Sequence, residues 1–432
     1  MSKGLALRHR ATLALAAALA VLPAAAADAP WVGAWSAAML RAPAPGNAVR
    51  GPLPAVTVAH RTLRALARVG VAGAQLRIVL DNRYGDAPVT FDAASVGLRD
   101  VGANLRPDSL RALRFGGRTA VTVAPGQEAQ SDPLDLAVQP GDVLGVSLYV
   151  AGRSVAGTWH PDPRNAQYLS GAGDRTRDPA LADAEGLPGV AWLARIDVRP
   201  TAPASAVVAL GDSITNGFQA SQLAAWPDAL QDRLAAARCP RAVLNAGINA
   251  NQVAAEQGNF GLGEAMRERV AHDALAVPGV RYLIVLGGIN DIGLAAAAAA
   301  HARGAATPSA QALAAPVIAA QRAIIAAARA RGVRVYGGTV LPYAGTTRTY
   351  TAAGEAARRQ LNAWIRGPAG YDGVIDFDRA LRDPAHPERL RADYDSGDSL
   401  HPSDAGYRAM AAAVPLALFD CPPASAHRGA SP

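Results

Sequence analysis

Lysine is almost absent from this chain of 432 residues: Lys3 is the only one. A reaction that depends on lysine, through a Schiff base, pyridoxal phosphate or a phosphate-binding loop, therefore has no residue to use in the body of the chain. The other basic residues are arginines scattered along the sequence, without a basic block, so we expect no nucleic-acid partner. Aromatic residues make up only 5% of the chain, which counts against an aromatic platform for binding sugars.

The apolar stretch Ala11–Leu22 contains no charged residue, and the residues on either side of it are typical of a secretory signal. Lys3, Arg8 and Arg10 precede this stretch, which is too short to span a bilayer as a helix, and Ala25–Ala27 offers a small-residue cleavage site. We therefore expect residues 1–27 to be a signal peptide and the mature protein to be secreted or periplasmic, with no membrane span. An uncleaved N-terminal anchor is the alternative.

Cysteine is scarce as well, with Cys239 and Cys421 as the only two. They offer no metal-ligand spacing, so we expect neither a metal nor another cofactor. Two cysteines in an exported protein usually pair. Cys239 lies at the end of a predicted helix and Cys421 just past the last one, so they could meet at one edge of a domain. We expect a disulfide between them, with two buried free thiols as the alternative.

The sequence pattern changes near residue 200, which predicts two domains. Residues 28–200 contain short, partly alternating apolar runs separated by turns such as Pro125-Gly126, a pattern typical of an antiparallel β-sandwich. Residues 203–422 alternate between short apolar strands and longer helical stretches, which predicts an α/β domain with a doubly wound parallel sheet. Residues 423–432 are expected to be a disordered tail.

The second domain has five predicted strands and five predicted helices. The strands are expected at 205–211, 242–245, 281–286, 333–339 and 373–376. The helices are expected at about 223–237, 264–276, 317–331, 352–365 and 404–418. Pro316 is expected to break or kink the chain.

Gly211-Asp212-Ser213 directly follows the apolar run Ala206–Leu210. A polar residue at the carboxyl end of a buried parallel strand lies where open α/β sheets bind ligands, so Ser213 is a candidate nucleophile. Taken alone, the tripeptide is also common turn material. The chain has no Gly-x-Ser-x-Gly motif, which argues against the nucleophile elbow of an α/β-hydrolase.

Three further blocks follow in order along the chain: Asn245-Ala246-Gly247, Gly287-Gly288-Ile289-Asn290 and Asp398-Ser399-Leu400-His401. Together with Gly-Asp-Ser they resemble the SGNH/GDSL hydrolase family over roughly residues 203–422. The resemblance implies a flavodoxin-like, three-layer α/β/α domain. Ala250 is a departure, because many family members carry a second glycine there. The N-terminal half resembles the β-rich region that precedes the catalytic domain in some secreted members.

Acyl transfer needs a nucleophile, a base, a group that orients the base, and donors for the developing oxyanion. His401 is the candidate base for Ser213, and Asp398 can accept from its Nδ1–H. In isolation, Asp398 could cap a loop and His401 could be an ordinary surface histidine. The resemblance implies an oxyanion hole made by the backbone N–H groups of Ser213 and Gly247 and the side chain of Asn290. Gly247 and Asn290 could each also be plain turn residues.

These residues predict an exported serine esterase that hydrolyses oxygen esters through an acyl-enzyme. A carbohydrate O-acetylesterase, acting on a small-molecule or polysaccharide ester, is preferred by analogy, because a signal peptide and an added sandwich suit an external polymer. A lipolytic or aryl esterase is the alternative within this class, and an inactive carbohydrate-binding or scaffold protein is the alternative outside it. Trp159, His160 and Tyr168 could reach the rim of the site or pack at the domain interface. The oligomeric state is left open.

Overall fold

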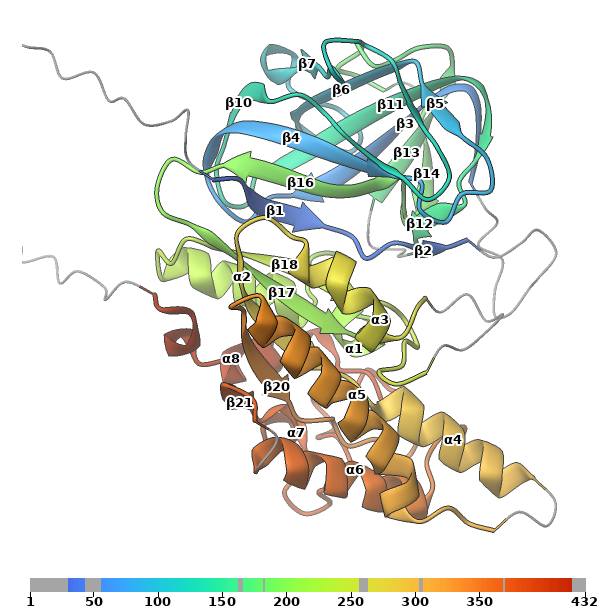
Figure 1. The fold of residues 1–432 in the computed structure, drawn as a ribbon, viewed down its shortest axis with the longest axis vertical. Helices are drawn as coiled ribbons and strands as arrows, with labels where there is room; N and C mark the ends of the chain where they lie inside the picture. The colour runs from blue at the N-terminus through green and yellow to red at the C-terminus, as the bar shows by residue number, and fades with distance from the viewer. Residues whose placement is uncertain are drawn as a thin grey trace, which may run out of the picture.

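The computed structural model describes residues 30–42, 56–161, 166–181, 183–255, 263–302, 306–367 and 370–421. A β-rich domain and an α/β domain lie against each other (Figure 1). The predicted signal peptide and the predicted tail lie outside the described residues, so both stay predictions.

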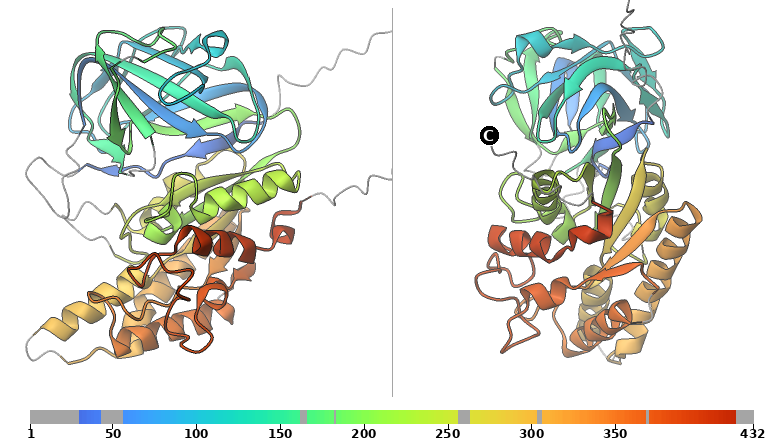
Figure 2. Two further views of the ribbon diagram at one scale, coloured as in Figure 1. Left: turned by 180° about the vertical axis from the view of Figure 1, so that it is seen from behind. Right: turned by 90° about the vertical axis from the view of Figure 1, so that its left-hand side faces the viewer.

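The N-terminal domain is built from antiparallel strands. One large sheet has the order β1-β16-β4-β10, with β9 also paired to β4, and the other has the order β14-β13-β3-β11-β6-β7. The two sheets lie one over the other (Figures 1 and 2), with residues such as Ile78 and Val146 fully buried in the core. The strands of these sheets are β1 (Val32–Ser36), β3 (Thr57–Arg68), β4 (Gly73–Asp81), β6 (Ala93–Leu98), β7 (Arg111–Ala112), β9 (Glu128–Gln130), β10 (Leu134–Val138), β11 (Val143–Val155), β13 (Ala166–Ala172), β14 (Glu185–Pro188) and β16 (Leu193–Arg199).

Two smaller sheets complete this domain. They have the orders β15-β12-β2 and β5-β8. Their strands are β2 (Leu40–Arg41), β5 (Val89–Phe91), β8 (Val121–Val123), β12 (Thr158–His160) and β15 (Val190–Ala191), and a short 3-10 helix, η1, spans Pro107–Ser109.

The C-terminal domain has five parallel strands in the order β18-β17-β19-β20-β21. In chain order this is 2-1-3-4-5, the flavodoxin-like arrangement that the resemblance implies. The strands are β17 (Ser205–Gly211), β18 (Arg241–Gly247), β19 (Val280–Leu286), β20 (Arg334–Gly338) and β21 (Gly373–Ile375). The helices are α1 (Ser213–Asn216), α2 (Trp226–Ala236), α3 (Met266–Val270), the π-helix η3 (Ala271–Leu275), α4 (Ile289–His301), α5 (Ala310–Ala330), α6 (Ala352–Arg366), α7 (Phe377–Leu381), α8 (Asp404–Ala413) and the 3-10 helix η4 (Leu416–Phe419).

Local sequence explains several of these elements. Every residue of β17 is buried, as expected of a parallel strand covered on both faces. Side-chain oxygens of Ser309, Thr351 and Ser403 accept backbone N–H groups at the starts of α5, α6 and α8, which satisfies donors that a helix leaves unpaired.

Helix α5 differs from its prediction. It begins at Ala310 and continues through Pro316, where the sequence predicts a break. Leu313, Val317 and Ile324 are buried in the domain core, and this packing offsets the hydrogen bond that the proline removes. Among the described residues, α5 is also the one helix that is long and apolar enough to cross a membrane by length and composition alone.

The two domains share one apolar cluster. Strand β1 lies beside β18 (Figure 1), and Gly33 N–H donates to the carbonyl of Pro278 at 2.9 Å. Gln231 of α2 donates to the carbonyl of Gly70 at 3.0 Å. Arg68 of β3 pairs with Asp232, so both apolar and polar contacts join the domains.

Cys239 and Cys421 form a disulfide, with their Cα atoms 5.0 Å apart. Cys239 follows α2 and Cys421 follows η4, so the bond ties the end of the described chain to the helix after Ser213. The predicted pairing is confirmed.

Candidate active site

The sheet carries three of the sequence blocks to one edge. Strands β17, β18 and β19 are neighbours, and Gly211 pairs in register with Gly247 on one side and with Leu286 on the other. Ser213 and Asn290 each lie just past the end of their strand, as does the turn after Gly247. These groups therefore lie at the carboxyl edge of the sheet, where open α/β domains bind ligands.

Ser213 is the first residue of α1. Asp212 caps this helix, because its Oδ1 accepts the N–H of Ile214 at 3.0 Å. Burial raises the pKa of Asp212 to about 7. The backbone N–H of Ser213 has no acceptor within the described residues, as expected for the first turn of a helix. It is therefore available to a ligand.

Ser213, His401 and Asp398 form a hydrogen-bonded chain. The Oγ of Ser213 lies 2.8 Å from Nε2 of His401, and the Nδ1 of His401 lies 2.6 Å from Oδ2 of Asp398. Ser213 is 7% exposed and His401 is 8% exposed, so both are largely shielded from water. The structure thus brings together all three residues in the arrangement that the sequence suggested.

Asp398 is held as a carboxylate. Its Oδ1 accepts the backbone N–H groups of His401 at 2.8 Å and Leu400 at 3.0 Å. Burial alone would raise the pKa of Asp398, but hydrogen bonds from the side chain and backbone of His401 outweigh it and lower the pKa to about 2. An ionised Asp398 fixes the ring of His401 with Nε2 toward Ser213.

Phe218 stands beside the base. Its ring centroid lies 4.7 Å from that of His401, and the residue is 39% exposed. Phe218 belongs to none of the sequence motifs, since a single aromatic residue in a loop carries no signal of its own. It gives the site an apolar wall next to the imidazole.

Asn290 is anchored to the neighbouring loop. Its Nδ2 donates to the carbonyl of Asn251 at 3.1 Å. Asp291 extends this link, because its carboxylate accepts the N–H groups of Val253 and Ala254, both at 2.9 Å. One N–H of the Asn290 amide is thereby used, and the other, which has no acceptor within the described ranges, can donate to a substrate oxygen.

Gly247 has a different role from the one that the resemblance implies. Its N–H donates to Oδ1 of Asn245 at 2.9 Å, so in this structure the N–H is not free for an oxyanion. A Cβ at this position would lie 2.1 Å from the backbone nitrogen of Asn216, so glycine is needed for α1 to approach β18. Asn249 and Ala250 follow, and their N–H groups have no acceptor in the part of the chain that the structure describes.

Ala250 keeps the backbone conformation that a glycine would adopt easily. Its φ is 59°, in the left-handed region that L-residues rarely enter. The loop therefore has the glycine-like turn without the glycine.

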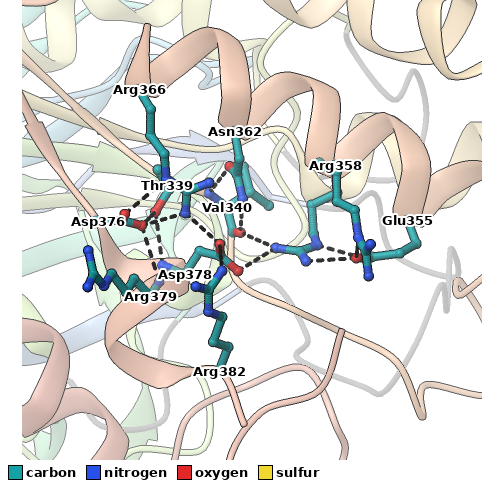
Figure 3. A network of polar contacts seen from close by, with 11 residues as sticks. Thr339, Val340, Glu355, Arg358, Asn362, Arg366, Asp376, Asp378, Arg379 and Arg382 are labelled. Carbon is teal, nitrogen blue, oxygen red and sulfur yellow. Dashed lines mark hydrogen bonds and ion pairs between the residues drawn. The ribbon is translucent and has the colours of Figure 1, made fainter. Parts of the chain in front are cut away.

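A buried polar network supports the loop that carries the base. Asp378 of α7 accepts from Arg358 and Arg366 of α6 at 2.7 and 2.6 Å, and Arg358 also donates to the carbonyl of Val340 at 2.9 Å (Figure 3). Val340 belongs to the segment after β20. Further along this segment, a Cβ on Gly345 would lie 2.6 Å from Oγ of Ser399, so the segment packs directly against the Asp398–His401 loop.

Of the three N-terminal-domain residues singled out, His160 contacts the catalytic domain. Its Nε2 lies 3.2 Å from Oδ1 of Asn216 in α1, and its Nδ1 lies 2.8 Å from the carbonyl of Ala38. Trp159 is buried at 2% exposure, and Tyr168 lies on β13, between β3 and β14. His160 thus packs one turn beyond the candidate nucleophile.

Within the described residues, no group of three or more His, Cys, Asp or Glu side chains is arranged to hold a metal ion.

Residues 209–409 match the GDSL-like Lipase/Acylhydrolase family. A comparison with curated proteins gave no match. Similar solved structures include the lipase/acylhydrolase from Enterococcus faecalis, with 20% identity, a TM-score of 0.35, and coverage of 48% of this chain and 92% of that one. A carbohydrate acetylesterase family member from Sinorhizobium meliloti has 16% identity, a TM-score of 0.38, and coverage of 50% and 97%. The M. smegmatis aryl esterase has 13% identity, a TM-score of 0.37, and coverage of 50% and 97%. The α/β domain of this chain therefore belongs to the GDSL-like lipase/acylhydrolase family of ester hydrolases, behind a β-rich N-terminal domain.

Proposed function

We propose that this chain is a serine esterase that hydrolyses oxygen esters through an acyl-enzyme. The observation that carries the proposal is the continuous hydrogen-bonded chain from Ser213 Oγ through His401 to Asp398, with distances of 2.8 and 2.6 Å. A serine hydroxyl is a weak nucleophile until a base takes its proton, and an oriented imidazole is such a base.

In the first half-reaction, Oγ of Ser213 attacks the ester carbonyl while Nε2 of His401 takes the hydroxyl proton. Asp398 stays ionised and stabilises the imidazolium that forms. The intermediate collapses when the alcohol leaves with the proton from His401, and the acyl group remains on Ser213. Water then attacks the acyl-enzyme while His401 takes one of its protons, and His401 gives that proton to Oγ of Ser213 as the bond to the acyl group breaks and the carboxylic acid leaves.

The proposed oxyanion site combines backbone and side-chain donors. Asn290 supplies the amide N–H that Asn251 does not use, and Ser213 supplies its backbone N–H. A backbone N–H from the Asn249–Ala250 turn replaces that of Gly247, which Asn245 already accepts. Donors fixed before the reaction stabilise the developing charge without reorganisation.

The proposed substrates carry acyl groups, acetyl first, on a carbohydrate, as a small molecule or a polymer. The predicted signal peptide and the added β-rich domain support this class, because they suit a substrate outside the cell. A lipolytic or aryl esterase is the second candidate. Phe218, 39% exposed and 4.7 Å from the ring of His401, favours it, since an apolar wall suits an acyl chain or an aryl group.

The hydrolysis rates of acetylated sugars and of p-nitrophenyl esters with two to twelve acyl carbons separate these candidates. A carbohydrate acetylesterase cleaves acetate esters and acetylated sugars, with rates that fall steeply as the chain lengthens. Rates that rise with chain length, with acetylated sugars untouched, would point to the lipolytic alternative. Phe218→Ala should lower the rates on long or aryl esters more than on acetyl esters if Phe218 contacts that part of the substrate.

The proposed location is the periplasm or the outside of the cell. The disulfide between Cys239 and Cys421 supports it, because disulfides persist mainly in oxidising compartments. Cell fractionation with N-terminal sequencing of the mature protein tests it. Export predicts a chain that begins near residue 28 in the periplasmic or secreted fraction, and a full-length chain in the cytoplasm would contradict it.

A further inference from the structure

Arg269 of α3 is a buried cation beneath the candidate active site, with a side chain that is 1% exposed. Nothing in the sequence motifs marks it. Burying a charge is costly unless the charge is paired and its hydrogen-bond donors are satisfied, so its partners show what it holds in place.

Its guanidinium donates to three acceptors around the site. NH2 reaches the carbonyl of Gly211 at 2.8 Å, NH1 reaches the carbonyl of Ala246 at 2.9 Å, and Nε reaches Oδ1 of Asn251 at 3.0 Å. Gly211 ends β17 and precedes Asp212-Ser213. Ala246 lies at the end of β18. One planar group therefore ties together the ends of two strands and Asn251, which follows β18.

The contact with Asn251 connects Arg269 to the oxyanion donors. The carbonyl of Asn251 accepts Nδ2 of Asn290 at 3.1 Å. Asn251 also follows the Asn249–Ala250 turn directly. A shift of Asn251 would therefore move both the amide of Asn290 and the backbone donors of the turn.

A chain of charged groups holds the guanidinium from the other side. Asp273 pairs with NH1 of Arg269 at 2.8 Å and with Nδ1 of His272 at 2.8 Å. The Nε2 of His272 lies 2.9 Å from Glu264, whose backbone carbonyl accepts Nδ2 of Asn251 at 2.8 Å. The series thus returns to Asn251, whose side chain is held by Arg269 on one side and by the backbone of Glu264 on the other.

We propose that Arg269 is a positioning residue that sets the geometry of the oxyanion site through Asn251. The inference rests on the proposed esterase function. Arg269 touches no reacting atom; it acts on the groups that do. Lysine cannot replace it, because an ammonium lacks the planar set of donors that reaches three acceptors in different directions.

The test compares Arg269→Lys with Arg267→Lys, its matched control on the same helix. Arg267 is 47% exposed and pairs with the neighbouring Glu268. With p-nitrophenyl acetate, Arg269→Lys should lower kcat by about 10 to 10²-fold with KM within about twofold, because misplaced donors weaken the transition state more than the bound substrate. Arg267→Lys should match the parent. Asn251→Ala, which keeps the guanidinium, should lower kcat selectively as well, and it provides the test if Arg269→Lys does not fold.

A double-variant cycle with Asn290→Ala separates a positioning role of Arg269 from a merely structural one, because it compares the kcat of the double variant with those of the two single variants. If Arg269 acts through the oxyanion site, the loss of kcat in the Arg269→Lys/Asn290→Ala double variant should be clearly smaller than the product of the two single losses, because residues that act as a unit do not have additive effects. Losses that multiply, or a folded Arg269→Lys or Asn251→Ala variant with the parent's kcat, would overturn the inference and leave the esterase function standing. A folded parent without esterase activity would instead overturn the proposed function, and this inference with it.

Discussion

At the scale of single residues, Asn290 donates one amide N–H to the carbonyl of Asn251, and the other has no acceptor among the residues that the structure describes. We expect Asn290→Ala to lower kcat by roughly 10²–10³-fold with little change in KM, since such a donor acts mainly in the transition state. Steady-state kinetics on a short-chain ester measures both constants. Asn290→Asp, which keeps the shape but removes the donors, should be at least as impaired. A sharp rise in KM with unchanged kcat would make Asn290 a substrate-binding residue instead.

The residues of the candidate triad could be predicted because each lies in a short local motif and their order along the chain is informative. Asp398 and His401 need only one loop to meet. The role of Gly247 could not be read in this way, since its N–H is taken by Asn245, two residues earlier. Arg269 gave no signal, because the carbonyls that it contacts come together only when β17 and β18 pair.

At the scale of elements, the π-helix η3 carries His272, which lies between the carboxylates of Asp273 and Glu264. Arg83 of the β-rich domain is a nearby positive charge that lowers the pKa of His272. Burial alone would lower the pKa of His272, but the hydrogen bonds to Asp273 and Glu264 outweigh it and raise the pKa to about 9. In the unfolded chain, the pKa of His272 has its ordinary value of 6.5. Protonated His272 therefore stabilises the folded chain fully below pH 6.5, and this stabilisation is lost as the pH rises through about 9.

We accordingly expect the urea concentration at the unfolding midpoint to decrease as the pH is raised from 6.5 to about 9.5. The His272→Gln variant should show little of this decrease. His386→Gln serves as the control, because the side chain of His386 is 66% exposed and lies 3.9 Å from Glu388. Equal pH profiles for the parent and His272→Gln would show that His272 is not the group responsible.

The segment after β20 depends on Asp378, which is shared by Arg358 and Arg366 (Figure 3). Asp378→Asn leaves Arg358 with Glu355 as its remaining counterion and weakens the hydrogen bonds that Arg358 and Arg366 make to this position, so we expect a loss of about 1–3 kcal/mol in the free energy of unfolding. Chemical denaturation measures it. Asp393→Asn, which breaks an exposed pair with Arg391, should change stability by less than about 1 kcal/mol. Similar values for the two variants would contradict a supporting role for the network.

On the scale of the whole molecule, the disulfide closes a sequence separation of 182 residues. In the chain-entropy model a loop of this length corresponds to about 5 kcal/mol of stabilisation, although measured values are often smaller. We expect the Cys239→Ser/Cys421→Ser variant to unfold at a clearly lower temperature than the parent. Alkylation of the denatured, unreduced protein followed by intact-mass measurement should add no label, and two labels would show that the bond is absent.

The two-domain architecture could be predicted because the hydrophobic period changes between the halves of the chain. The order of the parallel sheet came from the family resemblance, since periodicity identifies strands but not their neighbours. The prediction that a helix begins after Pro316 is wrong, because the burial of Leu313 and Val317 outweighs the tendency of proline to end a helix. The packing of β1 against β18 could not be predicted, because these two strands are far apart in the sequence.

Labelling of the folded protein with a fluorophosphonate, followed by mass mapping of the adduct, tests the nucleophile directly. The proposed mechanism predicts one adduct, on Ser213, together with loss of both labelling and ester hydrolysis in Ser213→Ala. A folded parent that does not react, or a Ser213→Ala variant that still reacts and hydrolyses esters, would contradict it.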